Sequence, residues 1–426
     1  MAEYLKKANP PTPQDVKQIR DTVTEILESV RDEGEKAVRR YSSRFDNWDP
    51  PSFRVDDETI KAAREQLSDE LLEAIEFAHH QIKTFAQLQR ESMQAFEKEI
   101  LPGIVLGQKH IPVRSVGAYV PGGRYPMLMS AQMSILTAKV AGVERVIACA
   151  PPWAGKGIHA PMLWSMHLAG ADEIYAVGGV QALGMMAYGI EGVPQVDFVV
   201  GPGNQYVAEA KRQLFGQVGI DLLAGPTEVL VIMDETADPK IVAADLLGQA
   251  EHGPTSPAVL ISTSSEKAEL VMDEIQRQLP ELPTAENAGT AWEGLGEVVI
   301  AATYEEAVTL ADSYAPEHLE VQTADNDYFL QHLRNYGTLF VGEEATVVFS
   351  DKCIGTNHIL PTSRAARYTG GLWVGKFLKT VTYQRCTQEG ALAVANQAAI
   401  ISEAEFFAGH AKTAYMRLEK YSNNDE

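Results

Sequence analysis

The sequence predicts an α/β protein that contains two Rossmann-like domains with mainly parallel sheets. Short apolar runs alternate with helical stretches from about residue 115, and each run ends in a turn rich in glycine or proline. Such alternation favours parallel strands that are joined by helices. Because the runs fall into two sets, we expect two sheets and therefore two domains. Strands are expected at 116–120, 145–150, 174–177 and 198–200 in the first set, and at 229–233, 258–262, 297–301 and 338–341 in the second.

Helical segments are expected at both ends of the chain. In the N-terminal region, Val23, Leu27 and Val30 recur at helical spacing. After Trp373 the strand pattern fades, so we expect a helical C-terminal tail that lacks a core of its own and docks on another body. The expected division is one discontinuous domain (15–118 with 229–372), one inserted domain (119–228) and the tail (373–426).

The composition narrows the classes of protein and partner. The 426 residues suffice for two or three domains, and the formal net charge of −22 repels phosphate backbones, which argues against nucleic acid as a partner. The three cysteines form no CxxC spacing and no disulfide framework, as is typical of a reducing compartment. The N-terminus carries no apolar signal segment, and no run is long enough to span a bilayer. We therefore expect a cytoplasmic protein without membrane contact.

Polar residues in separate segments could together hold a cation. Gln249 and His252 stand three positions apart, so on a helix they would project from one side, although such a pair is also typical of a solvated helix end. Asp351 could complete a site with them, and His410 would supply a fourth ligand. Zinc commonly takes four nitrogen, oxygen or sulfur ligands. Cys353 is close enough in sequence to Asp351 to compete as a ligand, and this alternative stays open.

An adjacent carboxylate and imidazole, Glu317-His318, could pass a proton between substrate and water. Histidine suits this role because its pKa lies near neutral pH. The alternative is a helix start after Pro316, with an exposed glutamate and an incidental histidine.

Glycine-rich turns follow three of the expected strands, at 121–123, 178–179 and 201–204. At strand ends, such turns let a ligand approach the backbone and present helix N–H groups to phosphates. No GxGxxG fingerprint is present, so the same residues could equally form tight turns and nothing more.

Three long motifs resemble the histidinol dehydrogenase family over nearly the whole chain. They are the segment from Asp221 to His252 (Asp-x-x-Ala-Gly-Pro-Thr-Glu to Gln-Ala-Glu-His-Gly), Ala315-Pro316-Glu317-His318-Leu319-Glu320, and Gly355-Thr356-Asn357-His358-Ile359-Leu360-Pro361-Thr362. The resemblance implies a zinc-dependent, NAD-linked enzyme that oxidises a primary alcohol through an aldehyde to a carboxylate. It also implies a homodimer in which the C-terminal tail reaches the partner's active site.

The resemblance also implies roles for individual residues. The discontinuous domain would carry the metal and acid/base residues, and the inserted domain would bind NAD. By position, the zinc ligands would be Gln249, His252, Asp351 and His410; the catalytic pair Glu317 and His318; the NAD contacts Tyr119, Gln181 and Asn204; and the substrate contacts Thr227, Gln249, His252, His318, Asp351, His358, Glu405 and His410.

The segment after the Asn357-His358 motif departs from the biosynthetic members of that family. Arg364, Trp373 and Lys376 stand where those enzymes tend to have small or neutral residues, and Arg367 adds a further cation. Guanidinium groups bind sulfonate or carboxylate oxygens through charge-assisted hydrogen bonds. The departures resemble the sulfopropanediol 3-dehydrogenase branch, which implies the anionic diol 2,3-dihydroxypropane-1-sulfonate as substrate, with Arg364 as its anchor. The alternative is that these cations are solvated surface charges.

Three other functions remain open on the sequence. The first is oxidation of L-histidinol to L-histidine. The second is a relative that binds nucleotide or metal without turnover, which the retained Glu317-His318 pair argues against. The third is thiol catalysis through Cys149 or Cys353, for which no neighbouring base is identifiable.

Overall fold

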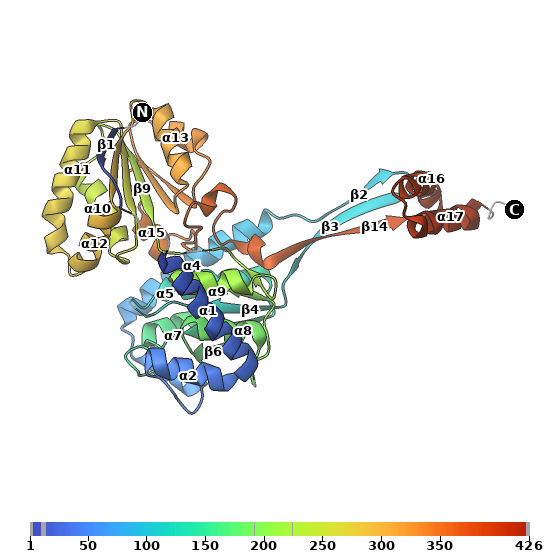
Figure 1. Ribbon diagram of the computed structural model, residues 1–426, viewed down its shortest axis with the longest axis horizontal. Helices are drawn as coiled ribbons and strands as arrows, with labels where there is room; N and C mark the ends of the chain where they lie inside the picture. Colours follow the sequence, from blue (N-terminus) through green and yellow to red (C-terminus); the bar gives the residue numbers. More distant parts are fainter. Residues whose placement is uncertain (1–2, 10–13, 124, 191, 224, 423–426) are drawn as a thin grey trace. The chain divides into compact units, whose positions relative to one another are not determined.

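The computed structural model describes residues 3–9, 14–123, 125–190, 192–223 and 225–422, and it confirms the α/β architecture (Figure 1). The chain divides into two compact units, each described by itself below. The first comprises Met1–Gln89 with Val113–Phe377, and the second Arg90–Pro112 with Leu378–Glu426. Among the described helices, none is both long enough and apolar enough to cross a bilayer.

The first unit contains a five-stranded, wholly parallel sheet. Its order is β6-β5-β4-β7-β8, so the chain begins in the middle and builds outward in both directions. The residues of β4 are all buried, as expected of a central strand that is covered on both faces. The bounds are β4 Ser115–Tyr119, β5 Arg145–Ala150, β6 Glu173–Ala176, β7 Phe198–Val200 and β8 Gly219–Ile220.

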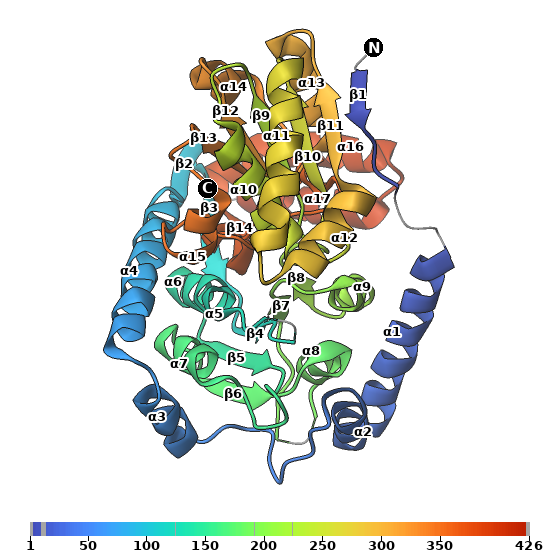
Figure 2. The same ribbon diagram turned by 90° about the vertical axis from the view of Figure 1, so that its left-hand side faces the viewer.

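Helices cover both faces of this sheet (Figure 2). One face carries α1 (Gln14–Glu33), α2 (Glu35–Asp46), α8 (Gly179–Tyr188) and α9 (Gln205–Leu214), which share one apolar core. The other carries α5 (Leu128–Ala131), a π-helical turn (Gln132–Leu136), α6 (Thr137–Ala141) and α7 (Ala160–Leu168). Helices α3 (Asp57–Glu65) and α4 (Asp69–Glu91) precede the sheet in the chain.

The packing of α1 and α2 differs from the grouping of residues 15–118 with 229–372. Val23 and Val30 of α1 lie in one core with residues of α8 and α9. Helical spacing identifies an apolar face, but it does not say which sheet that face covers. The positions of the domain boundaries themselves stay a prediction.

A six-stranded sheet forms the other part of the first unit. Its order is β1-β11-β10-β9-β12-β13, and only the edge strand β1 runs antiparallel to its neighbour. Its bounds are β1 Glu3–Lys6, β9 Val229–Met233, β10 Ala258–Ser262, β11 Glu297–Ile300, β12 His318–Gln322 and β13 Thr338–Val341. Two apolar cores cover its two faces. Its helices are α10 Pro239–Ala250, α11 Ser265–Gln278, α12 Ala285–Leu295, α13 Tyr304–Tyr314, α14 Asn326–His332 and α15 Val347–Lys352.

All eight expected strands are present within one or two residues of their predicted bounds. The sequence interpretation missed β12, which begins at His318. Its residues His-Leu-Glu-Val-Gln alternate polar with apolar, yet all five are buried. The strand was not predicted because polar side chains are unusual in a strand that is buried on both faces. These same buried polar side chains indicate where the site lies.

The second unit is only partly helical. It begins with β2 (Phe96–Leu101) and β3 (Ile104–Pro112), and β14 (Leu378–Cys386) pairs with β3 in an antiparallel sheet. The predicted helical tail is confirmed as α16 (Gln388–Ala404) and α17 (Ala408–Ser422), although strand β14, which was not predicted, stands between Trp373 and these helices. Strand β14 was not predicted because its many polar residues are also typical of a loop. The two helices share a small core of Ala395, Ala399 and Ala414.

Candidate active site

The strands β9 and β12 place four polar residues together at their amino ends. Thr227 and Glu228 come directly before β9, and Glu317 comes directly before His318, the first residue of β12. The two strands are parallel neighbours, with His318 opposite Val229. The side chains and backbone of these residues can therefore contact one another across the strand pair.

The Glu317 carboxylate is held by donors from this neighbouring segment. Its Oε2 accepts hydrogen bonds from the Thr227 hydroxyl at 2.6 Å and from the Glu228 backbone N–H at 2.9 Å. His318 Nδ1 lies 3.4 Å from the same oxygen. Both side chains of the pair are buried, at 5% and 2% exposure, so these contacts fix their positions away from bulk water. The alternative of an exposed glutamate at a helix start is wrong.

The partners of His318 also fix which ring nitrogen carries the proton. Nδ1 lies 3.1 Å from the carbonyl oxygen of Glu228, which can only accept a hydrogen bond. Nδ1 therefore carries the proton in the neutral ring, and Nε2 is left as the basic nitrogen. Burial opposes the charged ring, but the Glu317 carboxylate and then that of Asp351 outweigh it and raise the pKa of His318 to about 9.

Glu228 belongs to this group, although the sequence interpretation did not single it out. Burial, with the neighbouring Glu317 carboxylate, raises its pKa to about 8. Its Oε1 accepts a hydrogen bond from the Ser363 N–H at 3.0 Å. The signal in the sequence was the position of a carboxylate between the Gly225-Pro226-Thr227 turn and a wholly apolar strand, where a charged residue requires a partner.

The C-terminal end of α10 brings Gln249 to the same group. Its Nε2 lies 3.3 Å from His318 Nδ1, and the side chain is buried at 3% exposure. The helix ends at Ala250, so His252 stands in the following turn and not on the helix itself. Burial lowers the pKa of His252, which favours the neutral imidazole that can bind a metal.

Asp351, in α15, lies on the other side of His318. Its Oδ1 is 3.9 Å from His318 Nε2 and 3.9 Å from His358 Nδ1. Burial would raise its pKa, but the imidazoles of His358 and His318 and the nearby Lys352 ammonium lower it, so the carboxylate is favoured. In this arrangement a buried negative charge faces several nitrogen atoms.

The residues of this group fit a divalent metal ion. Asp351 Oδ1 and His318 Nε2 are both buried and have no hydrogen-bond partner among the described residues. Buried polar atoms without partners are rare and commonly await a ligand or ion. Within the described ranges no three His, Cys, Asp or Glu side chains are arranged to hold a metal by themselves. The proposed ligands Gln249, His252 and Asp351 supply an amide, an imidazole and a carboxylate, and a further ligand would come from elsewhere.

His358 is buried beside Asp351, where both of its ring nitrogens have protein partners. Nε2 lies 2.7 Å from the Ser130 hydroxyl and Nδ1 lies 3.2 Å from the Asp351 carbonyl oxygen. The neighbouring Asn357 donates from Nδ2 to the Met133 carbonyl at 2.9 Å. These bonds hold the loop against α5 and the π-helical turn. A direct contact between His358 and substrate stays a prediction.

The loop after His358 bonds to the segment before β9 through the two residues that precede Arg364. Ser363 donates to Glu228, and the Thr362 hydroxyl accepts from the Gly225 N–H at 2.7 Å. Arg364 has a left-handed backbone with φ of 65°, its side chain is exposed, and within the described chain its guanidinium has no partner. Arg364 thus follows directly after the two residues that join this loop to the segment before β9.

The other two cations of the loop are engaged elsewhere. Arg367 donates from Nε to the Arg364 carbonyl oxygen at 3.0 Å. Lys376 donates to the Thr369 hydroxyl at 2.8 Å, and burial lowers its pKa while Asp221 opposes that change. Of the three cations, Arg364 is the one for which no side-chain partner is found among the described residues.

The predicted NAD contacts lie at the carboxyl ends of the five-stranded sheet. Tyr119 ends β4, and its hydroxyl accepts from the Gly179 N–H at 3.3 Å. Gln181, in α8, is buried at 1% exposure, yet neither atom of its amide has a partner among the described residues. Asn204 caps α9, since its Oδ1 accepts from the N–H groups of Tyr206 and Val207.

The turn between β7 and α9 is fixed by a buried ion pair. Gly201 has φ of 132° and packs so closely on the Tyr119 carbonyl that a Cβ atom would overlap it. The Asp221 carboxylate accepts from the Gly201 N–H at 3.0 Å, Lys211 donates to the Gly201 carbonyl at 2.9 Å, and the two side chains form a buried pair. The conformation of the turn is thus fixed at the point where the strand order reverses, which is where sheets of this kind bind ligands.

Glu405 and His410 belong to the second unit, and both are exposed there. Glu405 ends α16, and the His410 ring lies 5.2 Å from the Phe407 ring. Their contributions to substrate and metal binding stay predictions.

Two neighbouring carboxyl groups, one fully buried and one half-buried, were also missed from the sequence and lie behind the site. Glu320 of β12 is fully buried and contacts Asp245 of α10, and burial together with that neighbour raises the pKa of Glu320 to about 8. Asp245 accepts from the Thr346 hydroxyl at 3.0 Å, and Glu320 accepts from the Val347 N–H at 3.0 Å. The pair therefore ties α10 and the start of α15 to the strand that carries His318.

The thiol alternative gains no support from Cys149. This residue lies within β5 with no exposed surface, and burial raises the pKa of its thiol well above its usual range. A nucleophilic cysteine needs the opposite shift. Cys353 is partly exposed and directly follows α15.

Similarity to known proteins covers nearly the whole chain. A family model described as histidinol dehydrogenase matches residues 10–418. A histidinol dehydrogenase homolog from Shouchella clausii is 54% identical over 99% of this chain and 100% of its own length. A sulfopropanediol 3-dehydrogenase from Ruegeria pomeroyi is 46% identical over 98% of this chain and 97% of its own length. The crystal structure of histidinol dehydrogenase from Elizabethkingia anophelis matches 97% of this chain and 98% of that chain, with a TM-score of 0.90 and 32% identity.

The extent of this similarity establishes the family. Its members are dimeric, NAD-dependent dehydrogenases that act on CH–OH groups of small substrates and use a Zn²⁺ ion. The buried Glu317-His318 pair, the polar group around Asp351 and the glycine turns are compatible with such chemistry. The protein belongs to the histidinol dehydrogenase family.

Proposed function

We propose that the protein oxidises 2,3-dihydroxypropane-1-sulfonate through the aldehyde to sulfolactate. The overall reaction converts the primary alcohol, two NAD⁺ and one water into the carboxylate, two NADH and three protons. The observation that carries the substrate assignment is the unpartnered guanidinium of Arg364, which follows directly on the loop that bonds to Glu228. The 46% identity to a sulfopropanediol 3-dehydrogenase supports the same assignment.

Arg364 suits an anionic substrate because of the charges around it. The net charge of −22 would repel a sulfonate unless a local cation offsets it. A guanidinium offers several donors in one plane, which matches sulfonate oxygens. L-Histidinol carries a basic amine and imidazole, so the same cation would disfavour it.

The residues of the acid/base pair have distinct roles in the proposed reaction. A bound zinc ion would lower the pKa of the substrate hydroxyl. In the neutral ring, which is populated above about pH 9, His318 accepts the hydroxyl proton at Nε2 as hydride leaves for NAD⁺, because its Nδ1 is committed to the Glu228 carbonyl. Glu317 then removes a proton from the water that attacks the aldehyde. The Thr227 hydroxyl and the Glu228 N–H hold Glu317 in place for that step.

The substrate assignment is tested by comparing kcat/KM for the sulfonate diol and for L-histidinol on one preparation with NAD⁺. We expect the sulfonate diol to be preferred and to yield two NADH per substrate. A clear preference for L-histidinol would overturn the sulfonate assignment and would favour oxidation of L-histidinol to L-histidine as the function. Absence of NADH with either substrate and with related alcohols would favour the non-catalytic alternative.

The variant Arg364→Ala tests the anchor. Losing a desolvated charge contact costs about 2–5 kcal/mol, so kcat/KM for the sulfonate should fall by orders of magnitude while NAD⁺ affinity is unchanged. Arg367→Ala is the matched control, since Arg367 is on the same loop but donates to a backbone carbonyl. Equal losses in the two variants would mean that the loop and not the Arg364 charge is responsible.

The proposed assembly is a homodimer in which His410 and Glu405 complete the partner's site. The exposed apolar side chains of the second unit support this, because its small core leaves Ile400, Ile401 and Phe406 at 55%, 59% and 94% exposure. A body with so little core gains stability by burying such residues against another surface.

Subunit mixing tests the sharing of residues between chains. Inactive His252→Ala and His410→Ala proteins are dissociated, mixed and reassociated. If His410 acts in the partner, half of the dimers are hybrids with one intact site, so about a quarter of wild-type activity should return. No recovery, with hybrids verified by mass, would place His410 in its own chain's site.

A further inference from the structure

The carboxyl edge of the five-stranded sheet lacks a carboxylate that dinucleotide sites usually contain. In sheets with this strand order, the second strand ends near an acidic residue that binds the adenosine ribose hydroxyls of NAD. The corresponding strand is β5, which pairs with β4 on the side away from β7. It ends in Ala150-Pro151-Pro152, so its own sequence supplies no such group.

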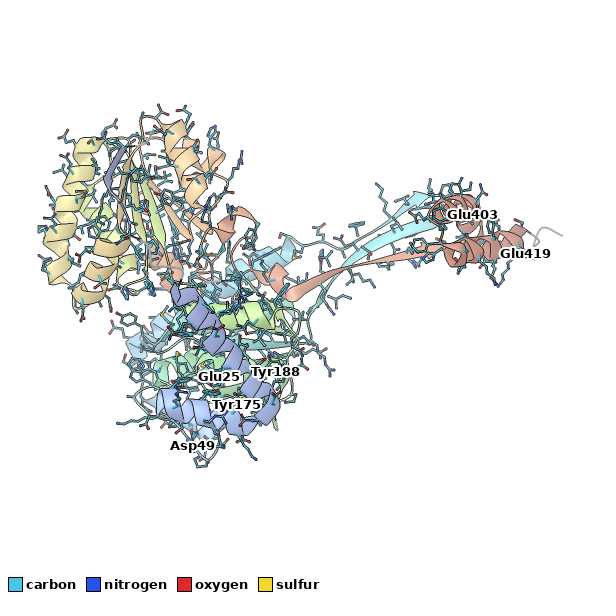
Figure 3. The ribbon with its side chains drawn as sticks, viewed as in Figure 1. Glu25, Asp49, Tyr175, Tyr188, Glu403 and Glu419 are labelled. Atoms are coloured by element: carbon cyan, nitrogen blue, oxygen red, sulfur yellow. The ribbon has the colours of Figure 1, made fainter. Side chains whose placement is uncertain are left out.

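A carboxylate reaches this place from outside the sheet, at the end of α2. Asp46 is the last residue of that helix, and Asn47 ends it with a left-handed backbone. The Trp48 indole donates to the Ala176 carbonyl at 2.9 Å, and the Ala176 N–H donates to the Phe53 carbonyl at 2.8 Å. These bonds fix the segment after α2 along the end of β6 (Figure 2), and Figure 3 labels Asp49 and Tyr175 on these two neighbouring segments.

The Asp46 carboxylate lies over the glycine turn that follows β6. A Cβ atom on Gly178 would be 3.3 Å from Asp46 Oδ2 and in collision with Pro151, so the turn, the end of β5 and the carboxylate converge. Asp46 also lies close enough to Tyr119 for its charge to contribute to the raised pKa of that phenol. Tyr119, whose hydroxyl accepts from the Gly179 N–H, and Gln181, at the start of α8, are proposed NAD contacts beside this turn.

The Asp46 carboxylate has no partner in the described chain. Its Oδ2 is buried without a hydrogen bond, while the residue as a whole is only partly buried, and rotation about Cβ–Cγ can exchange the two oxygens. Burial raises its pKa to about 6. The Gln181 amide beside the same turn is also buried and unpartnered. Two such groups beside one turn indicate a missing polar ligand, because each is a cost to the protein alone.

We propose that Asp46 accepts hydrogen bonds from the hydroxyls of the adenosine ribose of NAD and thereby selects NAD over NADP. The carboxylate takes the place of the acidic residue that β5 lacks. A 2′-phosphate there would meet a negative charge and find no compensating cation on the Ala150-Pro151-Pro152 end. The proposal rests on NAD binding at this edge, which is part of the proposed function.

The test measures NAD⁺ and NADP⁺ affinity of the full-length, zinc-loaded protein by calorimetry, together with its melting temperature without nucleotide. Asp46→Ala should weaken NAD⁺ by about 10- to 100-fold, the usual effect of losing a hydrogen bond to a charged group. Asp46→Asn should narrow the gap between NAD⁺ and NADP⁺ because it removes the charge. Both variants should melt no lower than wild type, because the lost carboxylate was unpaired. Asp49→Asn is the matched control, since Asp49 is exposed, pairs with Arg39 and should leave nucleotide affinity unchanged.

The outcomes separate this proposal from the proposed function. If wild type binds NAD⁺ and both Asp46 variants keep its affinity and its preference over NADP⁺, the Asp46 assignment is overturned while the dehydrogenase function stands. A lower melting temperature with unchanged affinity would assign Asp46 a purely structural role. If wild type binds no NAD⁺ at all, both proposals fail. If Asp46→Ala does not fold, the ratio of NAD⁺ affinity to NADP⁺ affinity in Asp46→Asn decides whether Asp46 contacts the ribose.

Discussion

The two sheets of the first unit present opposite ends of their strands to the proposed chemistry. In the five-stranded sheet, the proposed NAD contacts lie at the carboxyl ends of β4, β6 and β7. In the six-stranded sheet, the acid/base pair and its neighbours stand at the amino ends of β9 and β12. The chain passes directly from the carboxyl end of β8 to the amino end of β9 through residues 221–228.

The difference follows from the electrostatics of the two edges. At carboxyl ends of parallel strands, the following helices begin, and their free N–H groups favour anions such as phosphates. At amino ends the preceding helices finish, and their free carbonyls favour cations. Helix α10 ends at Ala250, next to Gln249 and His252, so its negative end is near the proposed metal. Glycine turns thus suit the proposed nucleotide edge, whereas buried side chains would carry out the proposed chemistry at the other edge.

The largest expected effect concerns Glu317 at the amino edge. Glu317→Gln should slow oxidation of the aldehyde by about 10²- to 10⁴-fold, the usual contribution of a general base, and slow the alcohol step less. Stopped-flow measurement of NADH from alcohol and from aldehyde separates the two steps. Equal loss in both would give Glu317 a wider role than water activation. Altered NAD⁺ affinity would show that the two edges are not independent.

Removal of His252 is expected to act on the metal alone. His252→Ala should lower zinc affinity by about 100-fold or more, because one proposed ligand is lost, and should leave NAD⁺ affinity unchanged. Metal analysis after dialysis and calorimetry with NAD⁺ give the two readouts. Full zinc content in the variant, or full wild-type activity in strong chelator, would contradict the proposed ligand set.

The carboxyl pair behind the amino edge is expected to matter for stability. Glu320→Ala leaves Asp245 and the Val347 N–H without their partner and should cost about 2 kcal/mol of unfolding free energy. Glu320→Gln imitates the protonated acid, so it should cost much less near neutral pH. Urea denaturation of both variants compares them. Similar losses of unfolding free energy in the two variants would mean that the charge of Glu320, and not a proton shared with Asp245, stabilises the contact.

The smallest expected effect is the pH dependence of Asp46 at the carboxyl edge. Burial raises its pKa from 3.8 to about 6 in the folded protein, so its contribution to stability is present below about pH 4 and lost as pH rises through 6. Discounted for partial exposure, the loss should be about 1 kcal/mol. Wild type should therefore lose that amount relative to Asp46→Asn between pH 4 and 7 without nucleotide. A constant difference would mean that Asp46 titrates normally.

The sequence predicted the sheets more completely than the site. Apolar runs such as 229–233 reveal strands because burial on both faces requires an unbroken apolar run. Strand β12 broke that rule with His318, Glu320 and Gln322, and it was missed for that reason. The antiparallel β14 was missed because its exposed polar residues leave no apolar pattern.

Motifs named Glu317, Gln249 and Asp351, but sequence could not reveal how they are supported. The roles of Glu228 and Asp245 depend on contacts between segments far apart in the chain, such as the bond from Ser363 to Glu228. The cost of burying these carboxylates becomes visible only when their neighbours are known.

Hydrogen exchange with separate addition of each ligand tests the division between the two edges most directly. Backbone amides of the zinc-free protein are compared with and without NAD⁺, and with and without Zn²⁺. NAD⁺ alone should protect segments 178–181 and 201–204, and Zn²⁺ alone should protect 249–252 and 351–353. Protection of 249–252 by NAD⁺ alone, or of 201–204 by Zn²⁺ alone, would contradict the assignment of nucleotide to the carboxyl edge and metal to the amino edge.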